Sequence, residues 1–248
     1  MIEQPLTRPT PRALAGPRTH GRVLALLLGY PERGRVLDLP AGTGALSLQL
    51  RAAGFEVTAG DISPELFAAP GVDCQRVDME QPLPYPDGEL DWVVCVEGIE
   101  HLEGPGGFLR ECARVLRPGG RLLVTTPNVL NLPSRVRALL TGFPSLVRPV
   151  AEGEPDPAHD HISPLPYYQL RGLLLRAGFR LERVTTDGWR RSALAFLPWY
   201  PLLALCTGRR LAAEARKHPG PDYGEIRRHL LCLDLLLGRT LIVVARAG

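Results

Sequence analysis

The sequence has few of the features that mark a disulfide-linked, zinc-binding or nucleic-acid-binding protein. Its five cysteines are scattered through 248 residues, and none belongs to a C-x-x-C pair. An odd and dispersed set argues against a disulfide or zinc framework and favours a reducing compartment. The net charge is only +3, from 29 basic and 26 acidic residues, which is too small to indicate nucleic acid. We therefore expect a cytoplasmic protein with no strong nucleic-acid signal.

We also expect neither a secretory leader nor a membrane-spanning helix. Prolines at positions 5, 9, 11 and 17 interrupt the N-terminal segment before any charged-then-apolar leader pattern develops. The most apolar run, residues 192–206, contains Pro198 and Pro201 and is shorter than the roughly 20 residues that cross a bilayer.

This apolar run lies in an insertion, residues 189–238, and has basic residues on either side. Aromatic residues between basic flanks are typical of a segment at a membrane surface, here the inner face. A lid or a homodimer interface would instead bury the run, with residues 229–237 as a packing partner. Both interpretations stay open. The flanking basic residues are Arg190, Arg191, Arg209, Arg210, Arg216 and Lys217.

Short apolar runs alternate with segments of helical periodicity along most of the chain. Strands are predicted at 35–39, 55–59, 74–77, 90–96, 121–125, 179–185 and 240–245, and helices at 22–28, 45–53, 108–116 and 168–177. The expected fold class is α/β: a doubly wound, Rossmann-like, seven-stranded, mostly parallel sheet with an antiparallel last strand. An apolar helical insertion precedes that strand. Residues 1–188 and 239–248 would form one domain, interrupted by the insertion at 189–238.

The stretch from Val36 to Gly44 runs from an apolar strand into a turn of small residues. Small residues let the backbone approach a ligand, and the N–H groups of a following helix attract negative charge. A dinucleotide fingerprint needs a third glycine where this chain has Ser47. The carboxylate of Asp38 suits an ammonium better than a pyrophosphate, and S-adenosylmethionine carries an ammonium. Both features disfavour the rival class, a nicotinamide-dependent oxidoreductase.

Further acids follow the next two predicted strands. Asp61 closes the second strand about twenty residues after the turn, and Asp78-Met79 follows the third. The runs at 83–91 and 114–120 precede strands four and five. With the glycine turn, this ordered series resembles the class I S-adenosylmethionine-dependent methyltransferases over roughly residues 23–184 and the last strand.

The resemblance implies an enzyme that binds S-adenosylmethionine, with Asp61 on the ribose hydroxyls and Asp78 and Met79 on the adenine. The cofactor-binding residues that it implies are Asp38, Pro40, Ala41, Gly42, Gly44, Asp61, Ile62, Asp78, Met79 and Glu97. Pro40 and Ala41 depart from the family, since many relatives have glycine and cysteine there. Proline fixes φ and removes an N–H, so affinity falls if that position needs a positive φ. A binding or scaffold protein without turnover is therefore an alternative.

A second polar group, Glu97-Gly98-Ile99-Glu100-His101, follows the fourth strand. Spacings of three and four residues place Glu97, Glu100 and His101 on one side if a helical turn begins here. His101 and Glu100 are the predicted catalytic residues, with His101 taking a proton from the acceptor. Alternatively, these three residues and His161 hold a divalent metal ion. The pattern resembles the small-RNA 2′-O-methyltransferases, which use such a metal, and the ubiquinone-type O-methyltransferases.

The sequence therefore predicts an S-adenosylmethionine-dependent methyltransferase. In-line transfer to a small-molecule, glycan or lipid-linked acceptor is expected, with oxygen as the atom methylated. A proline-rich loop at 144–166, with His159 and His161, is the expected lid.

Overall fold

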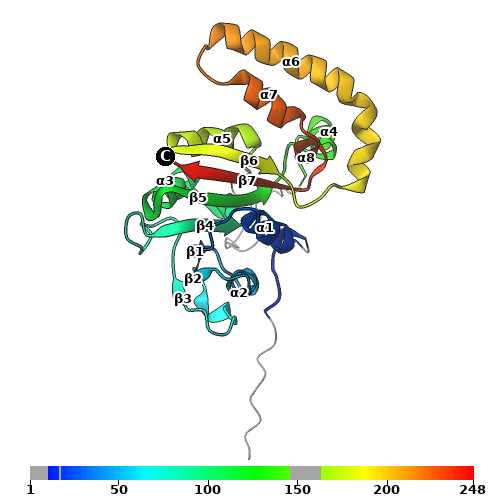
Figure 1. Cartoon of the computed structure of the whole chain (residues 1–248). Coiled ribbons are helices and arrows are strands. Elements are labelled where there is room, and N and C mark those ends of the chain that lie inside the picture. The colour runs from blue at the N-terminus through cyan, green and yellow to red at the C-terminus, as the bar shows by residue number, and fades with distance from the viewer. Residues whose placement is uncertain (1–10, 17, 146–162) are drawn as a thin grey trace, which may run out of the picture.

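A computed structural model of the chain describes residues 11–16, 18–145 and 163–248. A seven-stranded sheet in the order β3-β2-β1-β4-β5-β7-β6 forms its centre (Figure 1). The strands are β1 Arg35–Asp38, β2 Glu56–Asp61, β3 Cys74–Arg76, β4 Leu90–Val96, β5 Leu116–Pro127, β6 Phe179–Thr185 and β7 Thr240–Ala247. β7 runs antiparallel to both of its neighbours, and the other pairs are parallel. The predicted fold class is confirmed.

Helices cover both faces of the sheet. They are α1 Thr19–Leu28, α2 Ala45–Ala52, α3 Pro105–Val115, α4 Leu132–Thr141, α5 Tyr167–Arg176, α6 Tyr200–Lys217, α7 Tyr223–Leu231 and α8 Leu233–Leu237. Three 3-10 segments, η1 Pro64–Leu66, η2 Ile99–His101 and η3 Arg191–Trp199, complete the set within the described residues. α4 has no counterpart among the predicted helices.

The two faces of the sheet belong to different cores because successive strand residues point in opposite directions. Val36 and Val94 pack with α1 and α2. Leu37 and Val93 pack with α3 and α5 on the other face. A strand buried on both faces reads as a continuous apolar run, which is why β1 and β4 were predictable.

The last strand lies between β5 and β6, so that β6 forms the edge of the sheet (Figure 1). Val243 is opposite Val124 of β5 and opposite Val184 of β6. The predicted antiparallel pairing with β6 is confirmed. β5 is longer than predicted at both ends: it begins at Leu116, which pairs with Leu90 of β4, and it pairs with β7 as far as Pro127, opposite Thr240.

The insertion contains η3, α6, α7 and α8, and α6 and α7 extend together beyond the sheet (Figure 1). Leu236 and Leu237 of α8 are buried with Ala193, and Phe196 and Tyr200 pack against this cluster. The predicted packing of 229–237 against the apolar run is therefore present. Trp199 nevertheless has 64% of its surface exposed. Among the described helices, none is long and apolar enough to cross a membrane.

Buried Asn128 fixes the start of β7 against the end of β5. Its amide nitrogen donates to the carbonyl oxygens of Leu235, at 2.7 Å, and Gly238, at 3.0 Å. Its backbone N–H donates to the carbonyl of Arg239 at 2.9 Å. These bonds satisfy carbonyl groups that burial would otherwise leave without partners, and they hold the end of the insertion at the carboxyl edge of the parallel strands.

Candidate functional site

The predicted cofactor residues lie at the ends of four neighbouring parallel strands, β1 to β4. β1 lies between β2 and β4, and Asp38 is level with Ala59 of β2 and Val94 of β4. The loops after these strands therefore leave the sheet at one edge, which is where ligands bind in open α/β sheets.

The turn after β1 needs a left-handed backbone at Gly42, where φ is +52°, and at Gly44, where φ is +83°. Among the described residues other than glycine, only Glu97 has a positive φ. Pro40 and Ala41 thus occupy backbone positions that their side chains tolerate, and the backbone objection to Pro40 does not apply. Gly44 is also required for space, because a Cβ there would lie 2.6 Å from the Cβ of Ala69.

Direct contacts join this turn to the loops on either side. The Gly42 N–H donates to Oδ2 of Asp61 at 2.7 Å, and the Ala41 N–H donates to the carbonyl of Gly60 at 2.9 Å. On the other side the ring of Pro40 fills the space beside Gly98. A Cβ at position 98 would overlap that ring. The three loops therefore form one connected surface.

Asp38 is a buried carboxyl group with 1% of its surface exposed. Burial raises its pKa to about 7, and the nearby charge of Asp61 contributes to the rise. The hydroxyl of Ser47 donates to Oδ2 of Asp38 at 2.5 Å and opposes this shift. Ser47, where the dinucleotide fingerprint has glycine, thus stabilises the carboxylate, a role that the sequence did not reveal. A cation beside Asp38 would stabilise the ionised form further.

Asp61 ends β2 with both carboxylate oxygens held by backbone donors. Oδ1 accepts from the N–H of Ser63 at 2.9 Å, and Oδ2 accepts from Gly42. A carboxylate has about four lone-pair sites, so two remain for another pair of donors such as vicinal hydroxyls. Ile62 follows with its side chain half-exposed, which offers an apolar surface next to those oxygens.

Asp78 and Met79 lie just beyond β3, beside the loop that carries Asp61. The N–H of Val77 donates to the carbonyl of Asp61 at 2.9 Å. Asp78 is exposed, and its Oδ1 accepts from the N–H of Glu80 at 2.9 Å. Met79 is partly buried and packs against the core. The pair combines an accessible carboxylate with an apolar side chain.

The loop after β4 differs from the predicted helical turn. Glu97 lies before the turn with φ +49°, and η2 spans only Ile99–His101. The spacing argument that placed Glu97 on one side with Glu100 and His101 is therefore wrong for Glu97. Its N–H instead donates to Oγ1 of Thr125 at 3.0 Å, which fixes the loop to the end of β5. A left-handed residue without a glycine has no reliable local sequence signal.

Glu100 is deeply buried, with 1% of its surface exposed. Within the described residues neither carboxyl oxygen has a hydrogen-bond partner of normal geometry, and nor does the hydroxyl of Thr126. Burial raises the pKa of Glu100 to about 8, the charge of Glu97 adds to the rise, and the nearby Thr126 hydroxyl partly opposes it. At neutral pH this carboxyl group is largely protonated and is a hydrogen-bond donor. His101 follows it with its side chain partly exposed.

The described residues contain no group of three or more histidine, cysteine or acidic side chains arranged to hold a metal ion. Glu97, Glu100 and His101 do not form such a group. His161, the fourth predicted ligand, lies outside the described residues with His159 and most of the loop at 144–166. The metal hypothesis stays a prediction.

Comparison with known proteins places the chain among methyltransferases. The family described as "Methyltransferase domain" matches residues 37–124. The ubiquinone biosynthesis O-methyltransferase of Xanthomonas axonopodis pv. citri is 30% identical over 178 residues, which cover 68% of this chain and 69% of that protein. The protein of the same name from Xylella fastidiosa (strain 9a5c) is 32% identical over 174 residues, 66% of this chain and 65% of that protein.

Solved structures show the same fold. A SAM-dependent methyltransferase from Archaeoglobus fulgidus has a TM-score of 0.60 at 19% identity and covers 93% of this chain and 95% of its own. The [4+2]-cyclase SpnF has a TM-score of 0.51 at 23% identity and covers 92% of this chain and 80% of its own. Because a protein described as a cyclase shares it, the fold by itself does not fix the reaction.

The buried Glu100 predicts a pH-dependent difference in stability. A raised pKa in the folded protein means that stability is lost as pH rises from the unfolded value near 4.5 toward about 8. Replacing the carboxyl group by an amide removes this pH-dependent contribution to the free energy of unfolding. Between pH 5 and pH 8, we expect the free energy of unfolding of wild type to fall by ~3–4 kcal/mol more than that of Glu100→Gln, measured by urea denaturation.

The exposed neighbour Glu103 supplies the control, because Glu103→Gln should follow the wild-type pH dependence. Parallel curves for wild type and Glu100→Gln would contradict the buried, protonated state of this carboxyl group.

Proposed function

Because the chain belongs to the class I S-adenosylmethionine-dependent methyltransferases, we propose that it methylates an oxygen atom of a small-molecule or lipid-linked acceptor. The names of its relatives support oxygen as the atom methylated. The observation that carries the proposal is the joining of the loops after β1, β2 and β4, through Gly42 and Asp61 on one side and Pro40 and Gly98 on the other.

The described residues fit the parts of S-adenosylmethionine. Asp38 is buried and would gain most from the cationic amino group, because burial, with a contribution from the charge of Asp61, raises its pKa to about 7. The free lone pairs of Asp61 suit the two ribose hydroxyls. Ile62, Asp78 and Met79 together offer apolar surface and a carboxylate for the adenine. Gly42 and Gly44 keep the backbone of the turn close to the ligand.

Glu97, Glu100 and His101 are placed to act on the acceptor in this proposal. When bound, S-adenosylmethionine supplies a methyl group activated by its sulfonium. Holding the acceptor oxygen in line with that methyl group provides most of the rate enhancement. The acceptor O–H must lose its proton as the C–O bond forms, and His101 accepts it. Glu100, protonated at neutral pH, donates a hydrogen bond that orients the acceptor.

A divalent ion on Glu97, Glu100, His101 and His161 is a separate hypothesis, and the transfer written above needs no ion. Deprotonation by His101 alone would accelerate methylation of a hydroxyl by about 10²–10⁴.

The insertion supports a lipid-linked acceptor through contact with an anionic membrane surface. Trp199, Leu202 and Leu205 lie close together in sequence at the end of η3 and the start of α6, and each is at least half exposed. Arg209 and Arg210 follow on the same helix. Apolar side chains that enter the interface and arginines that bind anionic headgroups are the two components of peripheral binding.

The protonation state of Asp38 makes cofactor binding depend on pH. At pH 7 about half of the free protein carries a protonated Asp38, whereas binding the ammonium of S-adenosylhomocysteine requires the carboxylate. We expect affinity to rise by up to about tenfold per pH unit below pH 7 and to level off above it. Calorimetry in two buffers of different ionisation enthalpy should show proton release on binding.

In Asp38→Asn the proton release should disappear and the affinity should fall, whereas exposed Asp73→Asn should behave as wild type. Equal proton release in Asp38→Asn and wild type would mean that a group other than Asp38 releases the proton on binding.

The role of His101 predicts a loss that depends on the acceptor. For a hydroxyl compound that the protein methylates, His101→Ala should lower kcat by about 10²–10⁴. The thiol analogue, which ionises near neutral pH, should lose much less. Single-turnover rates with both acceptors measure the difference, and exposed His218→Ala is the control. Equal losses with both acceptors would exclude a base.

Membrane contact is tested by flotation with vesicles that contain phosphatidylglycerol. Replacing Trp199, Leu202 and Leu205 by serine should abolish flotation, because these exposed side chains supply the apolar contact. Serine at Leu28, Leu66 and Leu175, which are also exposed, should leave flotation unchanged. If the first triple variant floats like wild type, the membrane contact is wrong. If it instead converts a dimer into a monomer by light scattering, the apolar surface binds a second copy.

A further inference from the structure

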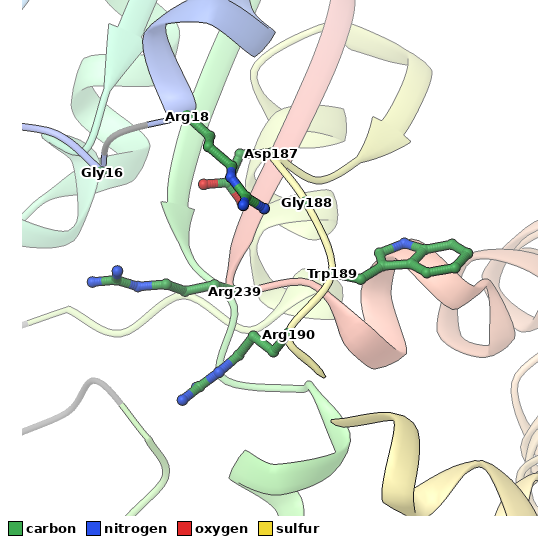
Figure 2. Close-up of a pocket in the computed structure, with 7 residues that line it drawn as sticks. All are labelled: Gly16, Arg18, Asp187, Gly188, Trp189, Arg190 and Arg239. Carbon is green, nitrogen blue, oxygen red and sulfur yellow. The ribbon is translucent and has the colours of Figure 1, made fainter. Parts of the chain in front are cut away.

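A cavity of about 210 Å³ opens at the carboxyl edge of the parallel strands, on the β6–β7 side of the sheet and not on the side of β1 to β3 (Figure 2). Three parts of the chain line it: Gly16 and Arg18 before α1, residues 187–190 after β6, and Arg239 before β7. A water molecule takes about 30 Å³ in the liquid, so the space admits a group several times larger.

The cavity lies within reach of the proposed acceptor position. Arg239 immediately precedes Thr240, which is opposite Pro127 at the end of β5. β5 in turn lies beside β4, and Thr125 of β5 accepts from the N–H of Glu97. Since neighbouring strands are about 4.8 Å apart, the two steps from β4 to β7 span roughly 10 Å. One small molecule could contact both places.

Positive charge gathers at the cavity without protein counter-ions. Within the part of the chain that the structure describes, the guanidinium groups of Arg18, Arg190 and Arg239 make no hydrogen bond or ion pair. Figure 2 shows Arg190 and Arg239 extending to the same side, away from Trp189, while Arg18 descends from the start of α1 toward Gly188. Some arginines elsewhere in the domain are paired, such as Arg121 with Glu182 at 2.9 Å.

The one carboxylate in the lining, Asp187, offsets only part of this charge. Oδ2 of Asp187 accepts from the hydroxyls of Thr19, at 3.1 Å, and Thr240, at 3.2 Å. No ion pair joins Asp187 to the lining arginines in the described ranges. Three arginines and one aspartate leave a formal charge of +2 in the lining. The N-terminus of the ten-residue helix α1 adds its positive dipole end on the same side.

We infer that this cavity binds an anionic group, a phosphate or a carboxylate, of the methyl acceptor through Arg18, Arg190 and Arg239. Guanidinium groups bind such oxyanions through paired N–H donors. The inference rests on the proposed function, and it narrows the acceptor to a molecule that carries an anionic group and spans the roughly 10 Å between the ends of β4 and β7. Binding energy gained there would position the acceptor for transfer.

The test uses inorganic pyrophosphate as the probe, titrated into the full chain by calorimetry at ~0.15 M ionic strength, where long-range attraction is screened. We expect the double variant Arg190→Gln/Arg239→Gln to weaken pyrophosphate binding at least tenfold. Neither guanidinium makes a hydrogen bond or ion pair within the described residues, so the variant should remain folded. The matched control is Arg176→Gln/Arg180→Gln, two exposed arginines at the end of α5 and the start of β6, which removes the same charge elsewhere and should leave pyrophosphate affinity unchanged.

Two further measurements separate the outcomes. S-adenosylhomocysteine should bind equally to wild type and to both double variants. If wild type binds pyrophosphate but not S-adenosylhomocysteine, the proposed function is wrong and the anion site stands. No pyrophosphate binding to wild type, or equal weakening in both double variants, would overturn the anion site. If Arg190→Gln/Arg239→Gln loses binding to phosphatidylglycerol vesicles but keeps binding to pyrophosphate, the arginines contact lipid headgroups, and the acceptor subsite is wrong.

Discussion

The hydrogen bond from the Gly42 amide to the Asp61 carboxylate is the contact on which the carboxyl edge of the sheet depends. It forms because the positive φ of Gly42 turns the N–H toward β2, a conformation that other residues adopt only at a cost. Ser63 fixes the second oxygen of Asp61. Loops from two strands are thereby held in one arrangement by backbone donors, before any ligand is present. Preorganisation of this kind reduces the conformational entropy lost when a ligand binds.

Much of the fold was predictable because the sheet is buried on both faces. Val36 and Leu37 enter opposite cores, so the apolar run of β1 is continuous and its flanking glycines mark its ends. α4 was not predicted, because Leu139 and Leu140 on it are largely exposed. Apolar periodicity reports a helix only where one face is buried. The extra length of β5 comes with pairing to β4 at Leu116 and to β7 at Pro127, which a local pattern does not reveal.

The candidate site, like the fold, has features that the sequence predicted and features that it did not. Asp38 and Asp61 were predictable as neighbours because the ends of parallel strands share one edge. The left-handed conformation of Glu97 was not, since no glycine marks it and Thr125, which accepts from its N–H, is distant in sequence. The arginine-lined cavity was not predictable from the sequence. Its residues Arg18, Arg190 and Arg239 come from segments that only the folded sheet brings together. Local spacing predicts chemistry on one loop, whereas a site shared among distant segments needs the three-dimensional structure.

The residues at positions 40 and 98, in the loops after β1 and β4, limit each other's size. The proline ring fills the space that the glycine leaves, so the two positions act as a complementary pair across the ends of β1 and β4. A side chain at 98 is compatible only with a smaller residue at 40, and a glycine at 40 would leave a gap beside Gly98. Substitutions at the two positions are therefore coupled, and a proline that looks foreign in the glycine turn is explained by its neighbour on the next strand.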